Sequence, residues 1–480
     1  MKAKINPKVV VSIVYITAMF MAAMDATIVN VALQTISREL QVPPSAMGTV
    51  NVGYLVSLAV FLPISGWLGD RFGTKRVFLI ALFVFTIASA LCGMANDITL
   101  LNIFRIIQGA GGGLLTPVGM AMLFRTFSPE ERSKISRFIV LPIAVAPAIG
   151  PIIGGFFVDQ MSWRWAFYIN LPFGIVALLF GLLFLAEHVE KSAGRFDSLG
   201  FILSAPGFAM LIYALSQGPS KGWISPEIMS TGIAGVVFIT LFIIVELKVK
   251  QPMLDLRLLK EPVFRKMSLI SLFSSAGLIG MLFVFPLMYQ NVIGASALES
   301  GLTTFPEAIG LMISSQIVPW SYKKLGARKV ISIGLICTAI IFVLLSFVNH
   351  DTNPWQIRAL LFGIGIFLGQ SVGAVQFSAF NNIAPPSMGR ATTIFNVQNR
   401  LGSAIGVAVL ASILAGFVNY GAQHNAHSDF LPYQAALIGS AIFLLVALLF
   451  SLRISDKEVM SKKKKKPLPV LQKEKEIVNE

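Results

Sequence analysis

Asp25, Arg105 and Glu307 are ionisable residues that lie inside stretches of sequence that are otherwise strongly apolar. A charged side chain at the centre of a membrane helix costs about 2.5–3.5 kcal/mol on insertion scales, so such residues usually face a cavity and have a function. This placement predicts that the three residues carry protons or recognise a charged solute. For the two acids an alternative stays open, in which each is a carboxylate near the outer end of its helix and is merely solvated.

The residues that follow Arg105 form a polar stripe. Positions 105, 108, 109, 112 and 116 share one face of a helix, which places Gln108 and Thr116 beside the guanidinium on a row of glycines. The stripe predicts part of a substrate cavity. A nucleotide loop of the type Gly-x-Gly-x-x-Gly is excluded, because Leu114 stands where the third glycine belongs and no strand precedes so apolar a run.

A second polar stripe occurs in the last third of the chain. Asn396, Asn399 or Arg400, and Ser403 fall on one helical face, and Gln376 lies in the preceding apolar run. We expect Gln376, Asn396, Asn399 and Arg400 to line the same cavity. Polar bonds that hold neighbouring helices together are the competing interpretation.

The short segment Gly66-Trp-Leu-Gly-Asp70-Arg71-Phe-Gly73-Thr-Lys-Arg76 lies as a charged loop between two apolar runs. Its bases alone could be cytoplasmic anchors beside a glycine turn. Asp70 adds nothing to such an anchor. The segment therefore predicts a latch that ties helix ends together in one conformation, with Gly66, Asp70, Arg71 and Gly73 as its residues.

Small residues and prolines alternate in the run 135–158. Ala146, Gly150 and Gly154 let another helix approach closely, while Pro147 and Pro151 remove backbone hydrogen bonds. A packing seam would explain the glycines alone, but the prolines favour a hinge. The residues assigned to this conformational switch are Gly150, Pro151, Gly154 and Gly155.

The composition defines the class of protein. Hydrophobic residues make up 55% of the 480 and charged residues only 13%. Many apolar runs have the length that a helix needs to cross a bilayer. The sequence predicts an all-α polytopic membrane protein with fourteen transmembrane helices, at residues 9–33, 46–68, 77–95, 98–123, 135–158, 165–186, 199–217, 228–248, 267–291, 298–320, 329–348, 354–380, 391–418 and 432–452.

The basic residues are distributed unevenly among the predicted loops. With the N-terminus in the cytoplasm, most of the 38 Lys and Arg residues fall in cytoplasmic segments, which predicts that both termini lie inside. The net charge of +15 then reflects this rule and does not indicate nucleic-acid binding. The basic tail around Lys462–Lys466 could rest on anionic lipids or be an ordinary inside-positive tail. The lone cysteines Cys92 and Cys337 predict neither a disulfide nor a metal site.

Two landmarks recur at one spacing, which indicates an internal duplication. Trp67 and Gly73 correspond to Trp320 and Gly326, and Arg105 corresponds to Arg358. The spacing between corresponding residues covers eight predicted helices. If two six-helix bundles were joined directly, it would cover six. The seventh and eighth helices are therefore expected to be an insertion between the bundles. The expected domains are an N-terminal six-helix bundle (1–190), the inserted pair with its linkers (191–260), a C-terminal six-helix bundle (261–453) and a cytoplasmic tail (454–480).

Five motifs together resemble those of the major facilitator superfamily, and more narrowly its fourteen-helix drug:proton antiporters. They begin at Asp25, Gly66, Arg105, Gly150 and Trp163 and read Asp-x-Thr-Ile-Val-Asn-Val-Ala-Leu, Gly-x-Leu-Gly-Asp-Arg-x-Gly, Arg-x-x-Gln-Gly-x-Gly-Gly-Gly, Gly-Pro-x-x-Gly-Gly and Trp-Arg-Trp-Ala-Phe-Tyr-Ile-Asn-x-Pro-x-Gly. The chain departs from the pattern at Thr74, where a base is usual, and at Ala146, where a glycine is usual.

The resemblance implies a secondary active exporter of lipophilic, often cationic drugs, working by alternating access. The chain shows no ATP-binding motif, so the expected energy source is the proton gradient, and no cofactor is expected. The partners are then a small-molecule substrate and protons, and a periplasmic accessory protein stays open. Alternatives are an exporter of one endogenous metabolite and, from a different class, a membrane sensor or enzyme. The expected location is the cytoplasmic (inner) membrane.

Within this interpretation each charged residue has a predicted role. Asp25 is the principal proton carrier, and Arg105 is the base that adjusts its proton affinity. Asp70 latches the outward-open state. Glu307 recognises positive charge on the substrate or belongs to the proton path.

Overall fold

The computed structural model describes residues 6–42, 47–128, 131, 146, 149–150, 152–158, 160–189, 194–424 and 429–455. These residues form helices and connecting turns and contain no strand, which confirms the predicted all-α class. The α-helices are α1 (Pro7–Glu39), α2 (Gly48–Phe61), α3 (Ser65–Phe72), α4 (Thr74–Met94), α5 (Ile98–Thr126), α7 (Trp165–Tyr168), α8 (Asn170–Phe184), α9 (Ser198–Lys221), α10 (Pro226–Lys248), α11 (Pro262–Asn291), α12 (Ala297–Ser346), α13 (Pro354–Ala379), α14 (Met388–His424) and α15 (Leu431–Leu452).

Eleven described helices are long and apolar enough to cross a membrane, or twelve if the bent pair α2 and α3 is one span. The number fourteen therefore stays a prediction. The predicted run 298–320 and most of the run 329–348 fall within α12, which ends at Ser346 and whose helical backbone is interrupted at Gly326. A third, 135–158, lies largely outside the described residues.

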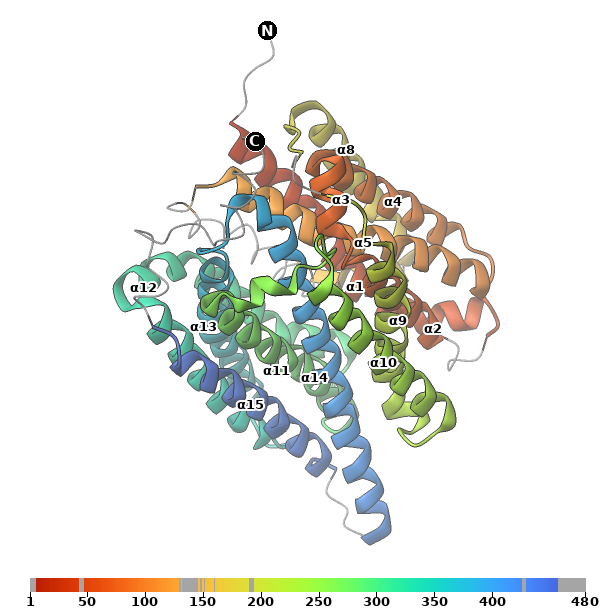
Figure 1. The fold of residues 1–480 in the computed structure, drawn as a ribbon. Coiled ribbons are helices and arrows are strands. Elements are labelled where there is room, and N and C mark those ends of the chain that lie inside the picture. Colours follow the sequence, from red (N-terminus) through yellow and green to blue (C-terminus); the bar gives the residue numbers. More distant parts are fainter. Residues whose placement is uncertain are drawn as a thin grey trace, which may run out of the picture.

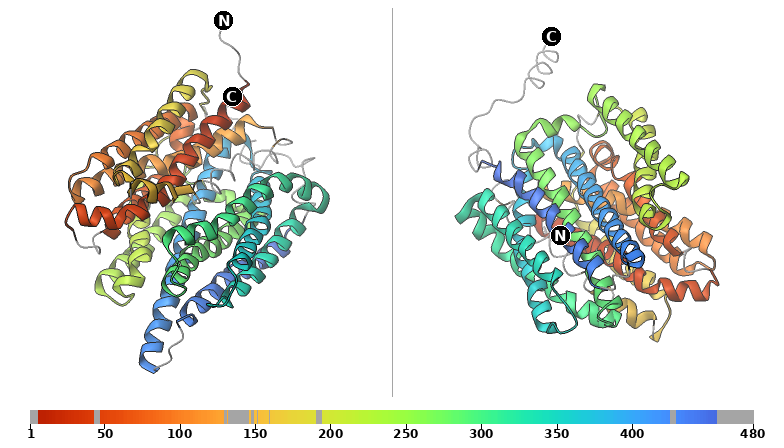
Figure 2. Two further views of the ribbon diagram at one scale, coloured as in Figure 1. Left: turned by 180° about the vertical axis from the view of Figure 1, so that it is seen from behind. Right: turned by 90° about the horizontal axis from the view of Figure 1, so that it is seen from below.

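The helices pack in two groups with a further pair beside them (Figures 1 and 2). Helices α1–α5 and α8 pack on one another, and so do α11–α15. The pair α9 and α10 packs together and contacts both α2 and α14. Direct contacts between the two groups join α14 to α3 and α5. In Figure 1 the first group runs from red to yellow, and the second is green to blue.

Glycines allow α5 to lie against two neighbouring helices at once. A methyl group on Gly109 or Gly113 would meet backbone carbonyls of Tyr54 and Leu58 in α2, and one on Gly111 would meet the backbone of α4 at Ala81. In lipid the hydrophobic effect does not drive helices together, so their association depends on van der Waals contact, which close backbone approach increases. The glycine row therefore fixes the position of α5, the helix that carries Arg105.

The charged loop expected at residues 66–76 is mostly helical, so that expectation was wrong in its local structure. Residues Ser65–Phe72 form α3, which bends by 53° from α2, and the turn is reduced to Gly73 with φ 98°. The short polar helix could not be distinguished from a loop, because it lacks the apolar run of a span. Gly326, the expected counterpart of Gly73, also has a positive φ of 81°.

Beside this turn, α4 and α8 are tied to each other through charged side chains. The carboxylate of Glu187 accepts hydrogen bonds from the backbone N–H groups of Lys75 (3.0 Å) and Arg76 (3.2 Å) at the start of α4. In return, the Lys75 ammonium donates to the carbonyls of Leu182 and Leu185 at the end of α8. Each charge lies at the helix end whose dipole it complements.

Gly73→Ala and Gly222→Ala form a matched pair of variants, because the two backbones have φ 98°, ψ 136° and φ 85°, ψ 131°. A side chain in either conformation costs about 1–3 kcal/mol. Only at Gly73 would the new methyl also collide with the Glu187 carboxylate, whereas the space around Gly222 is open. We expect Gly73→Ala to lower the thermal unfolding midpoint of the purified protein clearly more than Gly222→Ala. Equal shifts would show that the Glu187 contact adds nothing.

Candidate functional site

Asp25 lies at the centre of a buried hydrogen-bond cluster formed by three helices. Its Oδ2 accepts from Arg105 Nη1 at 2.7 Å, and its Oδ1 accepts from Gln108 Nε2 at 2.9 Å and Asn170 Nδ2 at 2.8 Å. Arg105 Nη1 also donates to Gln108 Oε1 at 2.7 Å. All four side chains are 0–1% exposed. The structure thus brings together Asp25, Arg105 and Gln108, which the sequence had singled out separately.

The arrangement compensates a charge pair that would otherwise be costly to bury. Isolated from water, each ion loses several kcal/mol of hydration, and only close pairing with further hydrogen bonds offsets that loss. The Asp25 carboxylate receives three donors. The Arg105 guanidinium carbon lies 4.3 Å from the centre of the Tyr54 ring, a cation–π contact. Its Nε has no hydrogen-bond partner among the described residues.

Asn170 is a member of this site that sequence reasoning missed. It begins α8, and its amide nitrogen also donates to Ser89 Oγ at 2.8 Å, which in turn donates to the Phe167 carbonyl. The sequence shows only that Asn170 is an amide in the first turn of an apolar run. It does not indicate which residue Asn170 binds, because Asp25 is 145 positions away.

Asp70 pairs with Arg125, a residue that the sequence did not assign to the latch. The distance between Asp70 Oδ1 and Arg125 Nη2 is 2.7 Å, and the side chains are 2% and 8% exposed. Arg125 Nε and Nη1 have no hydrogen-bond partner among the described residues. Among the described residues, both buried guanidiniums thus leave Nε unpaired, and Arg125 leaves Nη1 unpaired as well.

The two helix groups are in contact at the end of the molecule where Asp70 lies. A methyl group on Gly389 of α14 would stand 2.6 Å from Asp70 Oδ1, and one on Gly66 would meet Thr393 Oγ1. Ser65 Oγ and Thr393 Oγ share a hydrogen bond of 3.1 Å. Asp70 and Gly66 thus lie at a contact between α3 and α14. We refer to this end, where the α3–α4 turn lies, as the Gly73 end.

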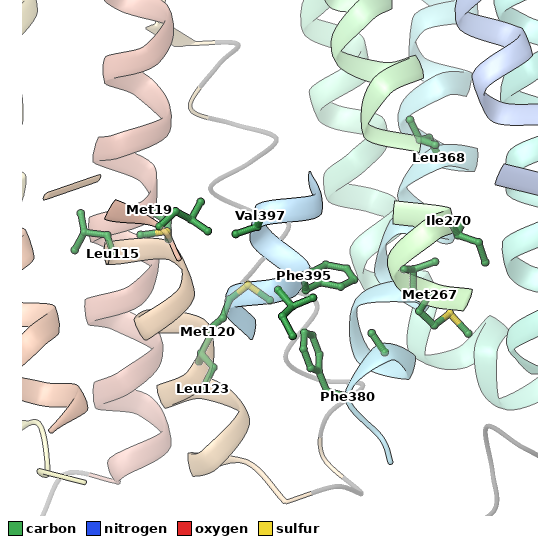
Figure 3. Packing of buried hydrophobic residues seen from close by; sticks show 14 of the residues in the cluster. Met19, Leu115, Met120, Leu123, Met267, Ile270, Leu368, Phe380, Phe395 and Val397 are labelled. Carbon is green, nitrogen blue, oxygen red and sulfur yellow. The ribbon is translucent and has the colours of Figure 1, made fainter. Parts of the chain in front are cut away.

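Apolar side chains continue this contact between α5 and the second group (Figure 3). The Phe124 and Phe380 ring centres are 4.5 Å apart, and Phe380 and Phe395 are 5.3 Å apart. Met120 lies beside α14, where its sulfur accepts from Asn396 Nδ2 at 3.2 Å. The two groups are therefore packed together from the Gly73 end up to the level of Met120.

The other predicted cavity residues have different surroundings. Thr116 donates to Met19 Sδ at 3.5 Å, and Gln376 is buried with its Oε1 unpartnered among the described residues. Asn399 accepts hydrogen bonds from Ser271 and Ser275 of α11. These bonds between helices are what the alternative interpretation expects, in which polar side chains hold neighbouring helices together. Arg400, one position further, is exposed.

Glu307 is buried in α12 and 5% exposed. Among the described residues, no side chain forms a hydrogen bond or ion pair with its carboxylate. Its backbone carbonyl lies where a methyl group on Gly365 of α13 would stand. The structure therefore does not place Glu307 in the Asp25 cluster.

The remaining switch residues are only partly described. A methyl group on Gly150 would collide with Thr27 of α1, so this glycine is a point of close helix approach. Gly154 is buried, whereas Gly155 has open space around it. Arg71 is exposed. Pro151 lies outside the described residues. Within the described residues, no group of three or more His, Cys, Asp or Glu could hold a metal ion.

The sequence matches the Major Facilitator Superfamily over residues 15–407. The chain belongs to this family. It is therefore a multi-pass membrane transporter and not an enzyme, and the resemblance found in the motifs is confirmed.

Three curated relatives extend this result. The chain is 33% identical to the multidrug transporter protein MdtP of Bacillus subtilis over 400 residues, 83% of this chain and 74% of that protein. It is 32% identical to the uncharacterized MFS-type transporter YhcA of the same species, covering 84% and 75%. It is 32% identical to the putative multidrug resistance protein MdtD of Pectobacterium atrosepticum over 447 residues, covering 90% and 93%.

Solved structures show the same fold. The human organic anion transporter MFSD10 superposes with a TM-score of 0.65 at 14% identity, covering 93% of this chain and 99% of that one. The proton:xylose symporter XylE superposes with a TM-score of 0.63 at 15% identity, covering 92% and 96%. At these identities the likeness concerns the fold alone.

The Asp25–Arg105 pair predicts strong energetic coupling. Arg105→Gln leaves a buried carboxylate without its cation, which costs about 3–5 kcal/mol. The double variant Asp25→Asn/Arg105→Gln removes both charges and keeps amides in place, so it should recover most of the lost thermal stability. Lys8→Gln, in the exposed pair Lys8–Glu131, is the control and should cost about 0–1 kcal/mol. A double variant no more stable than Arg105→Gln alone would contradict the coupling.

Proposed function

We propose that this transporter is a proton-coupled antiporter that exports lipophilic, cationic drugs from the cell. The observation that carries the proposal is the buried cluster of Asp25 with Arg105, Gln108 and Asn170. A carboxylate held by one cation and two amides far from water is a group whose protonation changes its partners. The relatives named for multidrug transport and resistance support the choice of substrates.

Proton coupling follows from the charge balance of the cluster. When Asp25 takes up a proton, Arg105 loses its counter-charge while it stays buried. That state is stabilised only if Arg105 moves or the helices around it open, so protonation is linked to conformation. One proton that moves down 100 mV supplies about 2.3 kcal/mol.

Alternating access would then move the bundles 1–190 and 261–453 against each other, with 191–260 as the inserted pair and 454–480 as a tail. We place the Gly73 end and both termini in the cytoplasm and the protein in the inner membrane. Contact between the groups at that end corresponds to a state closed to the cytoplasm. Gly66, Asp70, Arg71 and Gly73 latch this state. Gly150, Pro151, Gly154 and Gly155 supply a hinge against α1.

Glu307 is the second acid in this proposal. It is buried without a partner among the described residues, and an uncompensated carboxylate in low dielectric attracts either a proton or a cation. We assign to it the recognition of positive charge on the substrate. A place in the proton path is the alternative role.

Asp25→Asn should separate coupling from binding. In proteoliposomes with an imposed pH gradient, we expect the variant to lose accumulation of a lipophilic cation but to keep exchange of that cation when no gradient is applied. Asp97→Asn is the matched control, because it removes an acid at a helix N-cap while retaining a capping side chain. Gradient-driven accumulation by Asp25→Asn at the wild-type level would refute the assignment.

Asp70→Asn should weaken the latch. The amide keeps the shape but removes the charge that holds Arg125, so the population should shift toward the state open at the Gly73 end. Reporter cysteines on the two faces, in a protein without Cys92 and Cys337, would show faster labelling at that end and slower labelling at the other. Glu131→Gln, which breaks an exposed pair, should leave both rates unchanged. Unaltered labelling in Asp70→Asn would remove the latch from the mechanism.

A further inference from the structure

Arg400 is a cation without a visible counter-charge in the middle of a membrane span. It lies in α14 inside the apolar segment Pro385–Phe417, and its side chain is exposed. Among the described residues, none forms an ion pair or hydrogen bond with its guanidinium. A charge at this depth is costly unless it meets water or a partner.

The helical spacing of α14 gives the direction of Arg400. Asn396, four residues earlier, donates a hydrogen bond to Met120 of α5, so position 396 faces the first helix group. Residues four apart lie on one face of a helix, so Arg400 lies on the face of α14 that is turned toward the first group.

The contacts of α14 place Arg400 just beyond the closed part of the group interface. Thr392 Oγ donates to the Pro117 carbonyl at 3.2 Å, and Asn396 donates to Met120 one turn later. Arg400 is a further turn from the Gly73 end. The first exposed charge on this face thus lies one turn beyond the last of these two contacts.

Among the described residues, no acid forms an ion pair with Arg400. Asp25 binds Arg105, Glu246 of α10 accepts a hydrogen bond from the backbone N–H of Leu254, and Glu307 has no ion-pair partner. The space between the groups therefore presents a fixed positive charge. A solute that carries an anionic group would gain a charge-assisted, bidentate contact there, which a purely cationic solute does not form.

We propose that Arg400 is an anion-binding subsite and that the substrates include lipophilic zwitterions or anions, whose carboxylate or similar group binds its guanidinium. The proposal rests on the proposed export function and refines its substrate class. It assigns the anionic end of a zwitterion to Arg400 and leaves the cationic end for Glu307.

The test compares rhodamine B, which has a free carboxylate, with its methyl ester, which is a cation of nearly the same shape. Fluorescence polarisation with the purified protein should show roughly tenfold tighter binding of the free acid, as expected for one charged contact. Arg400→Gln should abolish this preference, because it should weaken binding of the free acid and leave binding of the ester unchanged. Arg400→Lys should keep part of it, because charge remains without the planar fork.

Arg358→Gln is the control, because it removes a charge from another helix of the same group, beside Trp355, and should preserve the preference. A wild-type protein that binds the acid no better than the ester, or binds neither, would overturn the proposal. An Arg400→Gln protein that keeps the preference would do so as well.

Transport distinguishes this failure from failure of the proposed function. If the free acid is preferred in binding but a pH gradient drives no accumulation of either dye in proteoliposomes, the subsite stands and proton-coupled export is wrong. If a gradient drives accumulation without a carboxylate preference, export stands and the anion subsite is wrong.

Discussion

The structure depends on how a carboxylate is kept inside a membrane protein. Asp25 would be unstable there alone, and it is retained by Arg105, Gln108 and Asn170 together. These donors come from α5 and α8, so the positions of both helices are set by one side chain of α1. The glycines of α5 serve the same constraint, because only a helix that lies close to α2 brings Arg105 under the Tyr54 ring.

The two buried ion pairs of the first group differ in where they lie, and the difference suits their proposed roles. The Asp25–Arg105 pair lies inside the first group, where Gln108 and Asn170 give the carboxylate two further donors. Asp70, which pairs with Arg125, lies at the contact between α3 and α14 of the second group. The surroundings of a pair at such a contact change when the two groups separate, which is what a latch requires.

Much of this could be predicted from the sequence, because a bilayer imposes strong rules on composition. Apolar length and basic loops gave the helical class, and Asp25, Arg105 and Asp70 were found as charges in unfavourable places. Asn170 and Arg125 were missed, because hydrogen-bond partners come from tertiary packing and helical periodicity reports only one helix. The same limit separates Asn399 from Arg400, since a shift of one position turns the side chain by about 100° around the helix, away from the α11 contacts of Asn399.

The two halves of the predicted internal duplication share a backbone feature but differ in their charges. Gly73 and Gly326 both retain a positive φ, so the turn is the same in the two halves. Asp70 corresponds to Lys323, however, and Arg105, paired with an acid, corresponds to Arg358, which stacks on Trp355 at 4.7 Å. In the described part of the second half, Glu307 and Arg400 have no protein partner. Buried acid–base pairs in the first half, and charges without an ion-pair partner in the described part of the second, favour a division in which the first half handles the proton and the second binds the solute, because an unpaired charge has more free energy left to give to a ligand.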